Sequence, residues 1–362
     1  MVGIVKVAAD PGQSLRCMRF HKTMILFVFL STAMALAEQM PSIGIIDFYG
    51  LRQVSKEQAQ QALQIKIGDD PKRVRGESKQ VEKRLEAIPG VSRARLSFVC
   101  CDAGKAILYV GIEEKGASAL QLRPAPQGKV RLPKDVVDAD RALDNAMRDA
   151  VVKGDTAEDD SHGYALSHNP AARAIEERYI TFAARDLNIL RDVLHNSADA
   201  NQRANAAQVI AYAADKRAIV PDLEYAMSDV DGEVRNNAMR ALGLISGFAQ
   251  NHPGLKIRVS PGPFVDMLNS LIWSDRNKSS MALMYLTERR DPALLADLRE
   301  HAMTSLIEMA RWKSTGHAMT SFVILGRIAG LPDKEIFDDW EHGDREKVIA
   351  AAMKTAADIR GR

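Results

Sequence analysis

The sequence predicts two parts, an α+β module of order β-α-α-β-β and an all-α solenoid built from helical pairs. Residues 43–114 pass through strand, helix, helix, strand and strand patterns within the length of one small module. From residue 185 onward every recognisable segment has helical periodicity, and one residue frame recurs at intervals of 32 to 43 residues. Such intervals are typical of stacked helical repeats, in which each pair of helices packs on the next.

The N-terminal residues 1–37 predict a secretory signal peptide. Basic residues precede an apolar run of 14 residues, Met24–Ala37, and a membrane-spanning helix needs ~20. Ala35-Leu-Ala37 supplies the small residues that signal peptidase accepts, so we expect cleavage between Ala37 and Glu38. A retained anchor is the alternative, and Met18 is a second candidate start. The expected location is the periplasm, reached by secretion across the inner membrane.

Composition places the chain among globular proteins. The formal net charge is +2 over 362 residues, and removal of residues 1–37, which hold four basic and one acidic side chain, leaves −1. A nearly neutral chain argues against nucleic acid as an obligate partner. The remaining 325 residues allow about two domains. No second apolar run approaches membrane-spanning length, so we expect no transmembrane span after signal cleavage.

Residues 41–115 contain the elements of the α+β module. The predicted elements are a strand at Ile43–Gly50, helices at Lys56–Leu63 and Ser78–Ala87, and hairpin strands at Arg93–Cys100 and Lys105–Glu114. Ser55 and Gln58 form a capping-box pattern at the start of the first helix. Apolar and polar residues alternate along the first hairpin strand. We therefore expect one face of the sheet to cover a core and the other to meet water.

The turns of this module resemble those of the polypeptide-transport-associated (POTRA) domain. They are Gly50 after the first strand, Gly68-Asp69 between the helices and Ile88-Pro-Gly-Val91 before the hairpin. The resemblance implies a non-enzymatic module that docks other polypeptides by adding a strand to an exposed sheet edge. It would place Arg93, Arg95 and Ser97 at the partner-binding edge. The alternative is that Arg93 and Arg95 only protect this edge from aggregation.

Two connecting regions are expected after the module. Residues 116–135, with two prolines and a glycine in Arg123-Pro-Ala-Pro-Gln-Gly128, predict a linker. Residues 136–184 predict a helical connecting region. Its expected parts are a helix over Val136–Val152, a mobile acidic loop at Gly154–Gly163, and a long helix capped by Asn169 with Pro170 in its first turn.

The region 185–362 has one clear repeat unit. A helix over Pro221–Val230 is followed by Asp231-Gly-Glu-Val-Arg235-Asn-Asn-Ala238-Met-Arg-Ala241-Leu-Gly243. This string resembles a HEAT repeat, which implies that Arg235 binds an aspartate in a helix turn. The same frame places Arg203 32 residues before Arg235, and Lys278 43 residues after it.

We therefore predict a HEAT-like α-solenoid over 185–362, whose second helices form a concave surface for a partner. Asn236 and Arg240 are the candidate partner-binding residues on that surface, with Gln208 in the place of Arg240 one repeat earlier.

No motif for catalysis or cofactor binding is found in the sequence. It has no G-x-S-x-G, H-E-x-x-H or G-x-G-x-x-G pattern and no phosphate-binding loop, so we expect no enzyme, cofactor or metal site. Trp273, Trp312 and Trp340 are predicted to fill the solenoid core. Cys100 and Cys101 are neighbours, and a vicinal disulfide and two free thiols both stay open.

The combined prediction is an exported scaffold that binds a protein or peptide partner in the cell envelope. The module would catch an extended segment, and the solenoid would present a helical surface to the partner. The first alternative is an assembly chaperone for envelope or outer-membrane proteins, which would bind many extended peptides weakly. The second is a HEAT-like lyase or ligand carrier, which would need a nucleophile or an acid–base pair on the concave face.

Overall fold

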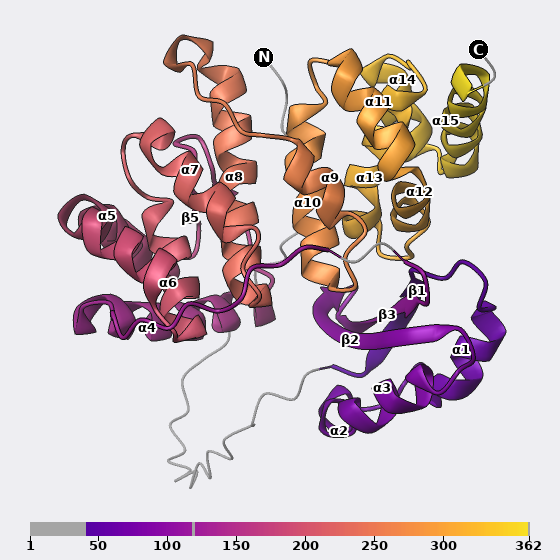
Figure 1. Cartoon of the computed structure of the whole chain (residues 1–362), viewed down its shortest axis with the longest axis horizontal. Coiled ribbons are helices and arrows are strands. Elements are labelled where there is room, and N and C mark those ends of the chain that lie inside the picture. Colours follow the sequence, from indigo (N-terminus) through magenta and orange to yellow (C-terminus); the bar gives the residue numbers. More distant parts are fainter. Residues whose placement is uncertain (1–40, 118–119, 361–362) are drawn as a thin grey trace, which may run out of the picture. The chain divides into compact units, whose positions relative to one another are not determined.

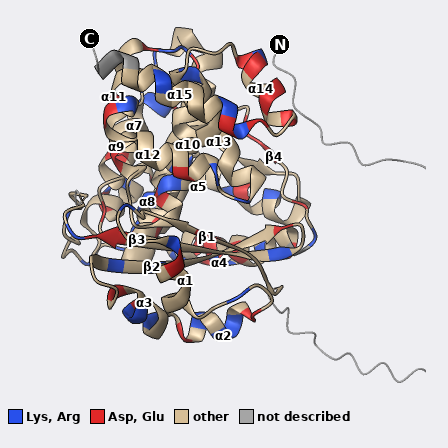
Figure 2. Cartoon of the chain, turned by 90° about the vertical axis from the view of Figure 1, so that its right-hand side faces the viewer, with Lys and Arg blue, Asp and Glu red and all other residues tan. Residues whose placement is uncertain are grey.

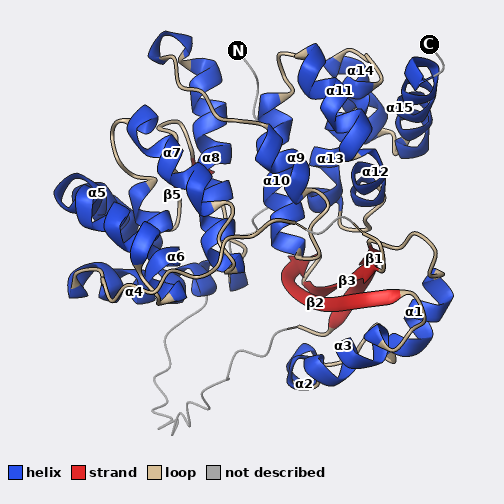
Figure 3. Ribbon diagram, viewed as in Figure 1, coloured by secondary structure: helices blue, strands red, loops and turns tan. Residues whose placement is uncertain are grey.

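A three-stranded sheet and three helices make up the first part of the structure, a computed structural model that describes residues 41–117 and 120–360. The elements are β1 (Ile43–Tyr49), α1 (Lys56–Leu63), α2 (Pro71–Gly76), α3 (Ser78–Glu86), β2 (Val91–Asp102) and β3 (Lys105–Glu114). β3 is the central strand; β1 pairs with it in parallel and β2 in antiparallel orientation (Figure 3). The order is β-α-α-α-β-β, because α2 is a helix beyond the two that the sequence predicts.

Side-chain caps start the first two helices. Ser55 Oγ accepts the N–H of Gln58 at 3.2 Å and the Gln58 side chain accepts the N–H of Ser55 at 3.0 Å, which confirms the predicted capping box. The unpredicted helix α2 has its own start signal. Asp70 accepts the N–H of Lys72 at 2.9 Å, and Pro71 occupies the first helical position.

One face of the sheet covers a small core of its own. Cross-strand pairs on this face are Ala94 with Ile112, Leu96 with Val110, and Phe98 with Leu108. The three helices cover it with buried apolar side chains, namely Leu63, Val74, Val81 and Leu85. The exposed sides of α2 and α3 carry several lysines and arginines (Figure 2).

Helices make up most of the remaining chain, which Figure 1 shows in sequence order. The elements are α4 (Lys134–Val152), β4 (Glu158–Asp159), β5 (Leu166–Ser167), α5 (Pro170–Asn196), α6 (Ala200–Ile210), α7 (Lys216–Ala226), α8 (Gly232–Asn251), the 3-10 helix η1 (Pro253–Leu255), α9 (Gly262–Met267), α10 (Trp273–Leu286), α11 (Pro292–His301), α12 (Met303–Ala310), α13 (Thr315–Ile328), α14 (Asp333–Glu341) and α15 (Arg345–Arg360).

These helices pack as an α-solenoid. The second helices of successive pairs, α6, α8, α10, α13 and α15, contact one another in that order. Asn169 caps α5 with Pro170 in its first turn, as predicted, and α5 runs past the expected boundary at residue 184 with a kink at Asp186. The predicted start of a helix at Pro221 is wrong, because α7 begins at Lys216, where Asp215 supplies the cap.

A row of buried arginines links the helical pairs. Arg203, Arg235 and Arg276 lie at the same place in α6, α8 and α10, because each donates to the backbone carbonyl oxygen six residues upstream. These bonds are 2.9 Å to Ser197, 2.8 Å to Asp229 and 2.6 Å to Ser270. We call the three residues the arginine row.

The arginine row corrects the predicted repeat register. Arg235 binds Asp275 in the first turn of α10, as the HEAT resemblance implies, and both side chains are at most 3% exposed. The prediction that Lys278 occupies the next equivalent position is wrong. Arg276 holds it, since the upstream carbonyl contact defines the position and Lys278 makes no such contact.

The second face of the sheet is also buried, so the prediction that it meets water is wrong for the central strand. Tyr49, Ile107 and Tyr109 belong to the core of the solenoid rather than to that of the module. The Tyr49 hydroxyl donates to the carbonyl oxygen of Leu271 at 2.7 Å. The Tyr109 ring stacks on Trp273, with centroids 5.1 Å apart, and lies 4.8 Å from the ring of Trp312.

A glycine permits this close approach of sheet and solenoid. A Cβ atom on Gly111 would lie 2.6 Å from the Tyr49 hydroxyl and 2.7 Å from the Leu271 carbonyl oxygen. Only a residue without a side chain therefore fits here. The predicted core roles of Trp273 and Trp312 agree with this packing, since both contact the sheet from within the solenoid core.

The predicted linker is an ordered edge of the solenoid. Arg123 pairs as an isolated β-bridge with Asp229, and Gly128 pairs with Ser197. The Arg123 guanidinium also lies over the Tyr225 ring, 3.2 Å from its centroid. Backbone groups of this segment thus bind to the turns between helices of successive pairs, a role that its proline-rich composition does not reveal.

The predicted mobile loop at Gly154–Gly163 is packed instead. β4 pairs with β5, and the Tyr164 ring beyond β4 stacks on Tyr212 at 4.9 Å. The Tyr212 hydroxyl donates to the carbonyl oxygen of Ala165 at 2.8 Å. Residues 158–167 therefore form a short hairpin seated on the solenoid, which we call the seated hairpin.

The predicted signal peptide and its cleavage between Ala37 and Glu38 lie outside the described residues. Within residues 41–117 and 120–360, no helix combines the length and the apolar character needed to cross a lipid bilayer.

Candidate functional site

A groove of about 320 Å³ lies along the second helices of the solenoid. Its floor comes from α6, α8 and α10, and its opposite side from α4, the seated hairpin and α5. The polar residues that line it are Asp144, Glu158, Glu176, Gln208, Glu233, Asn237, Arg240 and Lys278. We call this cavity the solenoid groove.

Helix geometry explains why the repeats line this groove with polar side chains. Asn237 and Lys278 each follow an arginine of the row by two positions, since Arg235 and Arg276 precede them. Two residues correspond to about 200° around an α-helix. The arginine is therefore buried at the turns between helices, and the residue two positions later points to the opposite side, into the groove.

Arg240 is anchored by the chain itself. Its Nη2 lies 2.6 Å and 2.7 Å from the two carboxylate oxygens of Glu158, which belongs to β4 of the seated hairpin. Both side chains keep partial contact with water, at 32% and 25% exposure. The pair closes one end of the groove and ties the hairpin to α8.

Lys278 lies in the groove without a bonding partner. No hydrogen bond or ion pair to its ammonium group is found in the described part of the chain, although Glu158 and Glu233 are near enough to attract it. Burial, followed by the repulsion of Arg240, lowers the pKa of Lys278 to about 8. Burial in the groove therefore disfavours the charged form of Lys278.

The structure places the three predicted solenoid residues differently. Gln208 and Arg240 line the groove as expected of a partner-facing row, and Gln208 has no hydrogen bond among the described residues. Asn236 lies outside the groove and bonds to Glu233 and Asn237. Asn237 takes its place in the lining; its amide nitrogen donates to the carbonyl oxygen of Ala204 at 3.0 Å, and its oxygen accepts from Asn236 at 3.3 Å.

The predicted sheet-edge residues lie on or beside β2, which is an edge strand. Arg93 forms an ion pair with Glu113, and Arg95 lies 3.6 Å from both Glu82 and Glu86 of α3. Ser97 is opposite Tyr109 on β3 and is half-buried. The two arginines therefore bind acidic residues of their own module.

Carboxylates of α3 cover part of the β2 edge. Glu86 accepts the N–H of Ala94 at 3.1 Å and Glu82 accepts the N–H of Leu96 at 3.0 Å. The N–H groups of a strand alternate between its two sides, so those of Phe98 and Cys100 face the same edge beyond the covered part. The edge open to a partner strand is shorter than the sequence suggests.

Cys100 and Cys101 are joined by a disulfide near the end of β2, across a cis peptide bond. Neither cysteine is among the residues that line the groove, which lies in the solenoid.

Sequence reasoning misses three groups that shape the groove. Lys278 has the wrong repeat position in the predicted frame, and Glu158 lies in a segment predicted to be mobile. Tyr212 lies just after α6 and supports the seated hairpin. A frame anchored on Arg276 would have found Lys278, since it stands where Asn237 stands one repeat earlier. No signal in the sequence points to the other two.

Within the described residues, no group of three or more His, Cys, Asp or Glu side chains is arranged to hold a metal ion. The buried cations of the groove region include Lys216, whose ammonium donates to the carbonyl oxygens of Ala211 and Ala213 at 2.7 and 2.9 Å. Burial lowers the pKa of Lys216 to about 7. Unlike Lys278, this lysine has its acceptors within the chain.

The fold and the groove define a class, a helical-repeat protein whose paired helices form an α-solenoid. Residues 187–255 match the family model of HEAT repeats. This stretch runs from α5 to η1 and includes Arg203, Arg235 and the part of α8 that lines the groove. This stretch of the chain is therefore similar to HEAT repeats.

The chain also has a low similarity to solved structures. A designed armadillo repeat protein, YIII(Dq)4CqI, shares 14% identity, with 52% of this chain and 91% of that chain covered and a TM-score of 0.33. The complex of CpcE and CpcF of phycocyanin lyase from Nostoc sp. PCC7120 shares 15% identity, with 65% and 100% covered and a TM-score of 0.20. No argument below rests on either likeness. No curated protein matches the chain.

Proposed function

We propose that the chain is a non-enzymatic scaffold for protein interaction, whose solenoid groove holds an extended segment of a partner. The observation that carries this proposal is Lys278, a charged side chain without a partner in a polar groove. An unpaired buried charge costs stability unless something supplies an acceptor, and such groups cluster at functional sites. A bound segment would supply its backbone carbonyl oxygens or a side-chain acceptor.

The other side chains of the groove suit the same kind of ligand. Gln208 offers an amide with both a donor and an acceptor, and the oxygen of Asn237, which accepts from Asn236, has a second lone pair. Amide side chains can bind the N–H and C=O groups of an extended backbone without reading its sequence. Gln208 and Asn237 come from the second helices of successive pairs, α6 and α8, although they occupy different positions of the repeat.

A second docking surface is proposed at the open end of the β2 edge. The proposal rests on the resemblance of residues 41–115 to a POTRA domain and on the uncovered N–H side of Phe98 and Cys100. A partner strand would pair beside β2 beyond Leu96, where the α3 carboxylates end. Arg93 and Arg95 would then act mainly as edge protection, since both bind acidic residues of the module.

The proposed setting is the periplasm. Support for export comes from the apolar run Met24–Ala37 and the small residues at its end. The proposed partners are accordingly proteins or peptides of the cell envelope. An assembly chaperone for many envelope clients is the alternative that uses the same two surfaces, and a lyase or ligand carrier is the alternative that would use the groove for a small molecule.

Site-specific photo-crosslinking in the producing organism tests the proposal. One probe replaces Gln208 in the groove, a second replaces Ser97 on the edge strand, and a control replaces Arg217, an exposed residue of α7 outside the groove. A single protein adduct at Gln208 that is missing at Arg217 supports a dedicated partner in the groove.

The other outcomes separate the alternatives. Many envelope proteins crosslinked at Gln208 would favour the chaperone, and an adduct at Ser97 alone would move the docking site to the sheet. No adduct at either position, together with a tightly bound small molecule in the purified protein, would refute the scaffold in favour of a ligand carrier.

A further inference from the structure

The third arginine of the row is less completely paired than the first two. Arg203 binds Asp229 through Nε and Nη2, both at 2.8 Å, and Arg235 binds Asp275 through the same two nitrogens at 3.0 and 2.8 Å. Arg276 has one carboxylate contact, from Nη1 to Glu308 at 3.3 Å. Its Nη2 has no hydrogen bond among the described residues. Its Nε donates to the Ser270 carbonyl oxygen instead, so one guanidinium nitrogen of Arg276, Nη2, has an open acceptor position.

Glu308 cannot fill that position, because it is shared. One of its oxygens lies 2.5 Å from Nη1 of Arg52, and the other accepts the N–H of Gly50 at 3.1 Å. A single carboxylate therefore serves two guanidinium groups and a backbone amide. Arg276 is 3% exposed and also lies over the Tyr49 ring, 4.7 Å from its centroid. Burial lowers the pKa of Arg276, although the nearby Glu308 opposes this effect.

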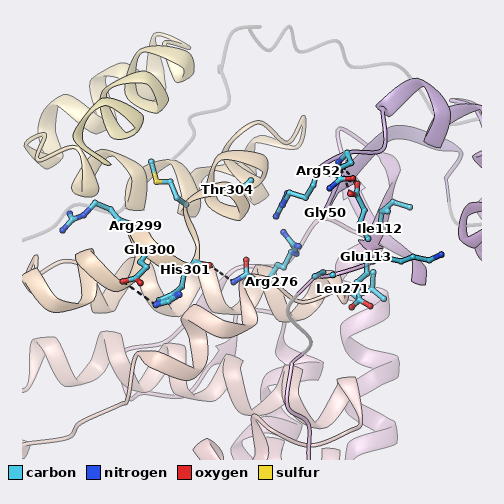
Figure 4. Close-up of a pocket in the computed structure, with 17 residues that line it drawn as sticks. Gly50, Arg52, Ile112, Glu113, Leu271, Arg276, Arg299, Glu300, His301 and Thr304 are labelled. Atoms are coloured by element: carbon cyan, nitrogen blue, oxygen red, sulfur yellow. Dashed lines mark hydrogen bonds and ion pairs between the residues drawn. The ribbon is translucent and has the colours of Figure 1, made fainter. Parts of the chain in front are cut away.

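A cavity of about 460 Å³ opens beside these arginines. Figure 4 shows Gly50, Arg52 and Ile112 of the sheet module on one side of it and Arg299, Glu300 and His301 on the other, with Arg276 between them. Lys115 and Arg299 also line it, and neither has an ion pair in the described part of the chain. A volume of this size is typical of small-molecule sites.

The charges around the cavity favour an anion. Among the residues that line the cavity and their ion-pair partners, His301 apart, five side chains are basic and four are acidic. The basic ones are Arg52, Arg93, Lys115, Arg276 and Arg299, and the acidic ones are Glu113, Glu114, Glu300 and Glu308. Two of the acidic groups are occupied elsewhere. Glu113 binds Arg93, and Glu114 accepts the backbone N–H groups of the segment 52–54. The set therefore carries a net charge of +1; Arg52 and Arg276 share the single carboxylate of Glu308, and Lys115 and Arg299 have none among the described residues.

We propose that this cavity is a binding site for a small oxyanion ligand, whose carboxylate or phosphate group binds Arg276 and Arg52 in competition with Glu308. A planar or tetrahedral oxyanion offers paired acceptor oxygens, to which guanidinium groups donate in a two-point arrangement. The site is separate from the solenoid groove, so the proposal does not depend on the partner proposed above. It would place a small-molecule ligand where the sheet meets the solenoid.

Isothermal titration of the purified chain at low ionic strength tests this site, with inorganic phosphate and malonate as the two probes. The informative variant is Glu308→Gln, which keeps the shape and the acceptor for Gly50 but removes the competing charge. We expect it to bind the probe about tenfold more tightly than the parent, and Arg52→Gln to bind about tenfold more weakly, as suits one charged hydrogen bond. Glu346→Gln, which alters an exposed pair with Arg311, is the matched control and should leave affinity unchanged.

A role of these residues in folding alone would give a different result. Lys115→Gln alters an exposed side chain without an ion pair, so it should fold normally and weaken probe binding about twofold. Saturable binding of phosphate only, or of malonate only, supports the site and identifies the anion class. The proposal is overturned if neither probe binds the parent and Glu308→Gln, or if Arg52→Gln binds as tightly as the parent.

Discussion

Replacing Gly111 with alanine should break the contact between sheet and solenoid. The new Cβ would stand 2.6 Å from the Tyr49 hydroxyl and 2.7 Å from the Leu271 carbonyl oxygen. These two atoms are bonded to each other at 2.7 Å, so the methyl group would intrude on a buried hydrogen bond. Either the sheet or the loop before α10 has to move, and the hydrogen bond is lost when it does.

The expected cost has two parts. Overpacking of a buried site costs ~1–3 kcal/mol. A buried hydroxyl and carbonyl left without each other add ~1–2 kcal/mol. We therefore expect Gly111→Ala to lower the free energy of unfolding by about 3 kcal/mol. Tyr49→Phe removes only the hydroxyl and should cost about 1 kcal/mol.

Urea unfolding followed by tryptophan fluorescence measures both variants, because Trp273 and Trp312 pack on the Tyr109 ring at this contact. Gly316→Ala is the matched control. Nothing lies within 4 Å of a Cβ built on Gly316, and the residue is in the first turn of α13, so alanine there should be neutral or slightly stabilising. An unfolding midpoint of Gly111→Ala equal to that of the parent would show that sheet and solenoid do not meet through this glycine.

Two further predictions concern charged groups. The pKa of Lys278 is about 8 in the folded chain against 10.5 as its ordinary value, so the folded state binds fewer protons between these values and stability rises with pH across that window. Lys278→Gln should make this rise smaller, while Lys216, whose pKa burial lowers to about 7, still contributes to it. The variant should be stabilised at pH 7 by ~1–2 kcal/mol, after allowance for partial contact with water. Thermal melts from pH 7 to 10.5 would contradict this if both proteins followed the same curve. Asp275→Asn leaves Arg235 buried without its carboxylate and should cost ~3–5 kcal/mol in urea unfolding. Arg311→Gln, which breaks an exposed pair with Glu346, should change stability by less than ~1 kcal/mol, and equal losses in the two variants would refute the special position of the arginine row.

Local signals in the sequence predict most elements of the fold. Ser55 and Gln58 start α1, Asn169 and Pro170 start α5, and the HEAT-like string places Arg235 on an aspartate. These are short-range patterns, which depend on hydrogen bonds within one turn or on one recurring frame. α2 is missed because only the Gly68-Asp69 turn is expected between the two predicted helices, and the start signal Asp70-Pro71 that follows it goes unused.

Long-range packing is the part that the sequence does not show. Residues 105–114 form a nearly continuous apolar run, as strands buried on both faces do. The alternation of apolar and polar residues along β2, however, suggests one solvent-exposed face for the whole sheet. The aromatic partners that cover the second face, Trp273 and Trp312, are far away in the sequence. The same holds for the candidate site, since Lys278 and Glu158 meet in the groove from distant segments.

The burial of Tyr109 depends on residues that are synthesised much later than the tyrosine itself. Its hydroxyl bonds to His317, which lies 208 residues later in the sequence. At a synthesis rate of about 5–20 residues per second, roughly 10–40 s pass between the appearance of this tyrosine and that of its partner. Until Trp273 and Trp312 are made late in this interval, the aromatic rings that cover the second face of the sheet are missing. A nascent or translocating chain would therefore expose an aromatic strand surface for tens of seconds, long enough for a holding chaperone to bind before the C-terminal helices close over it.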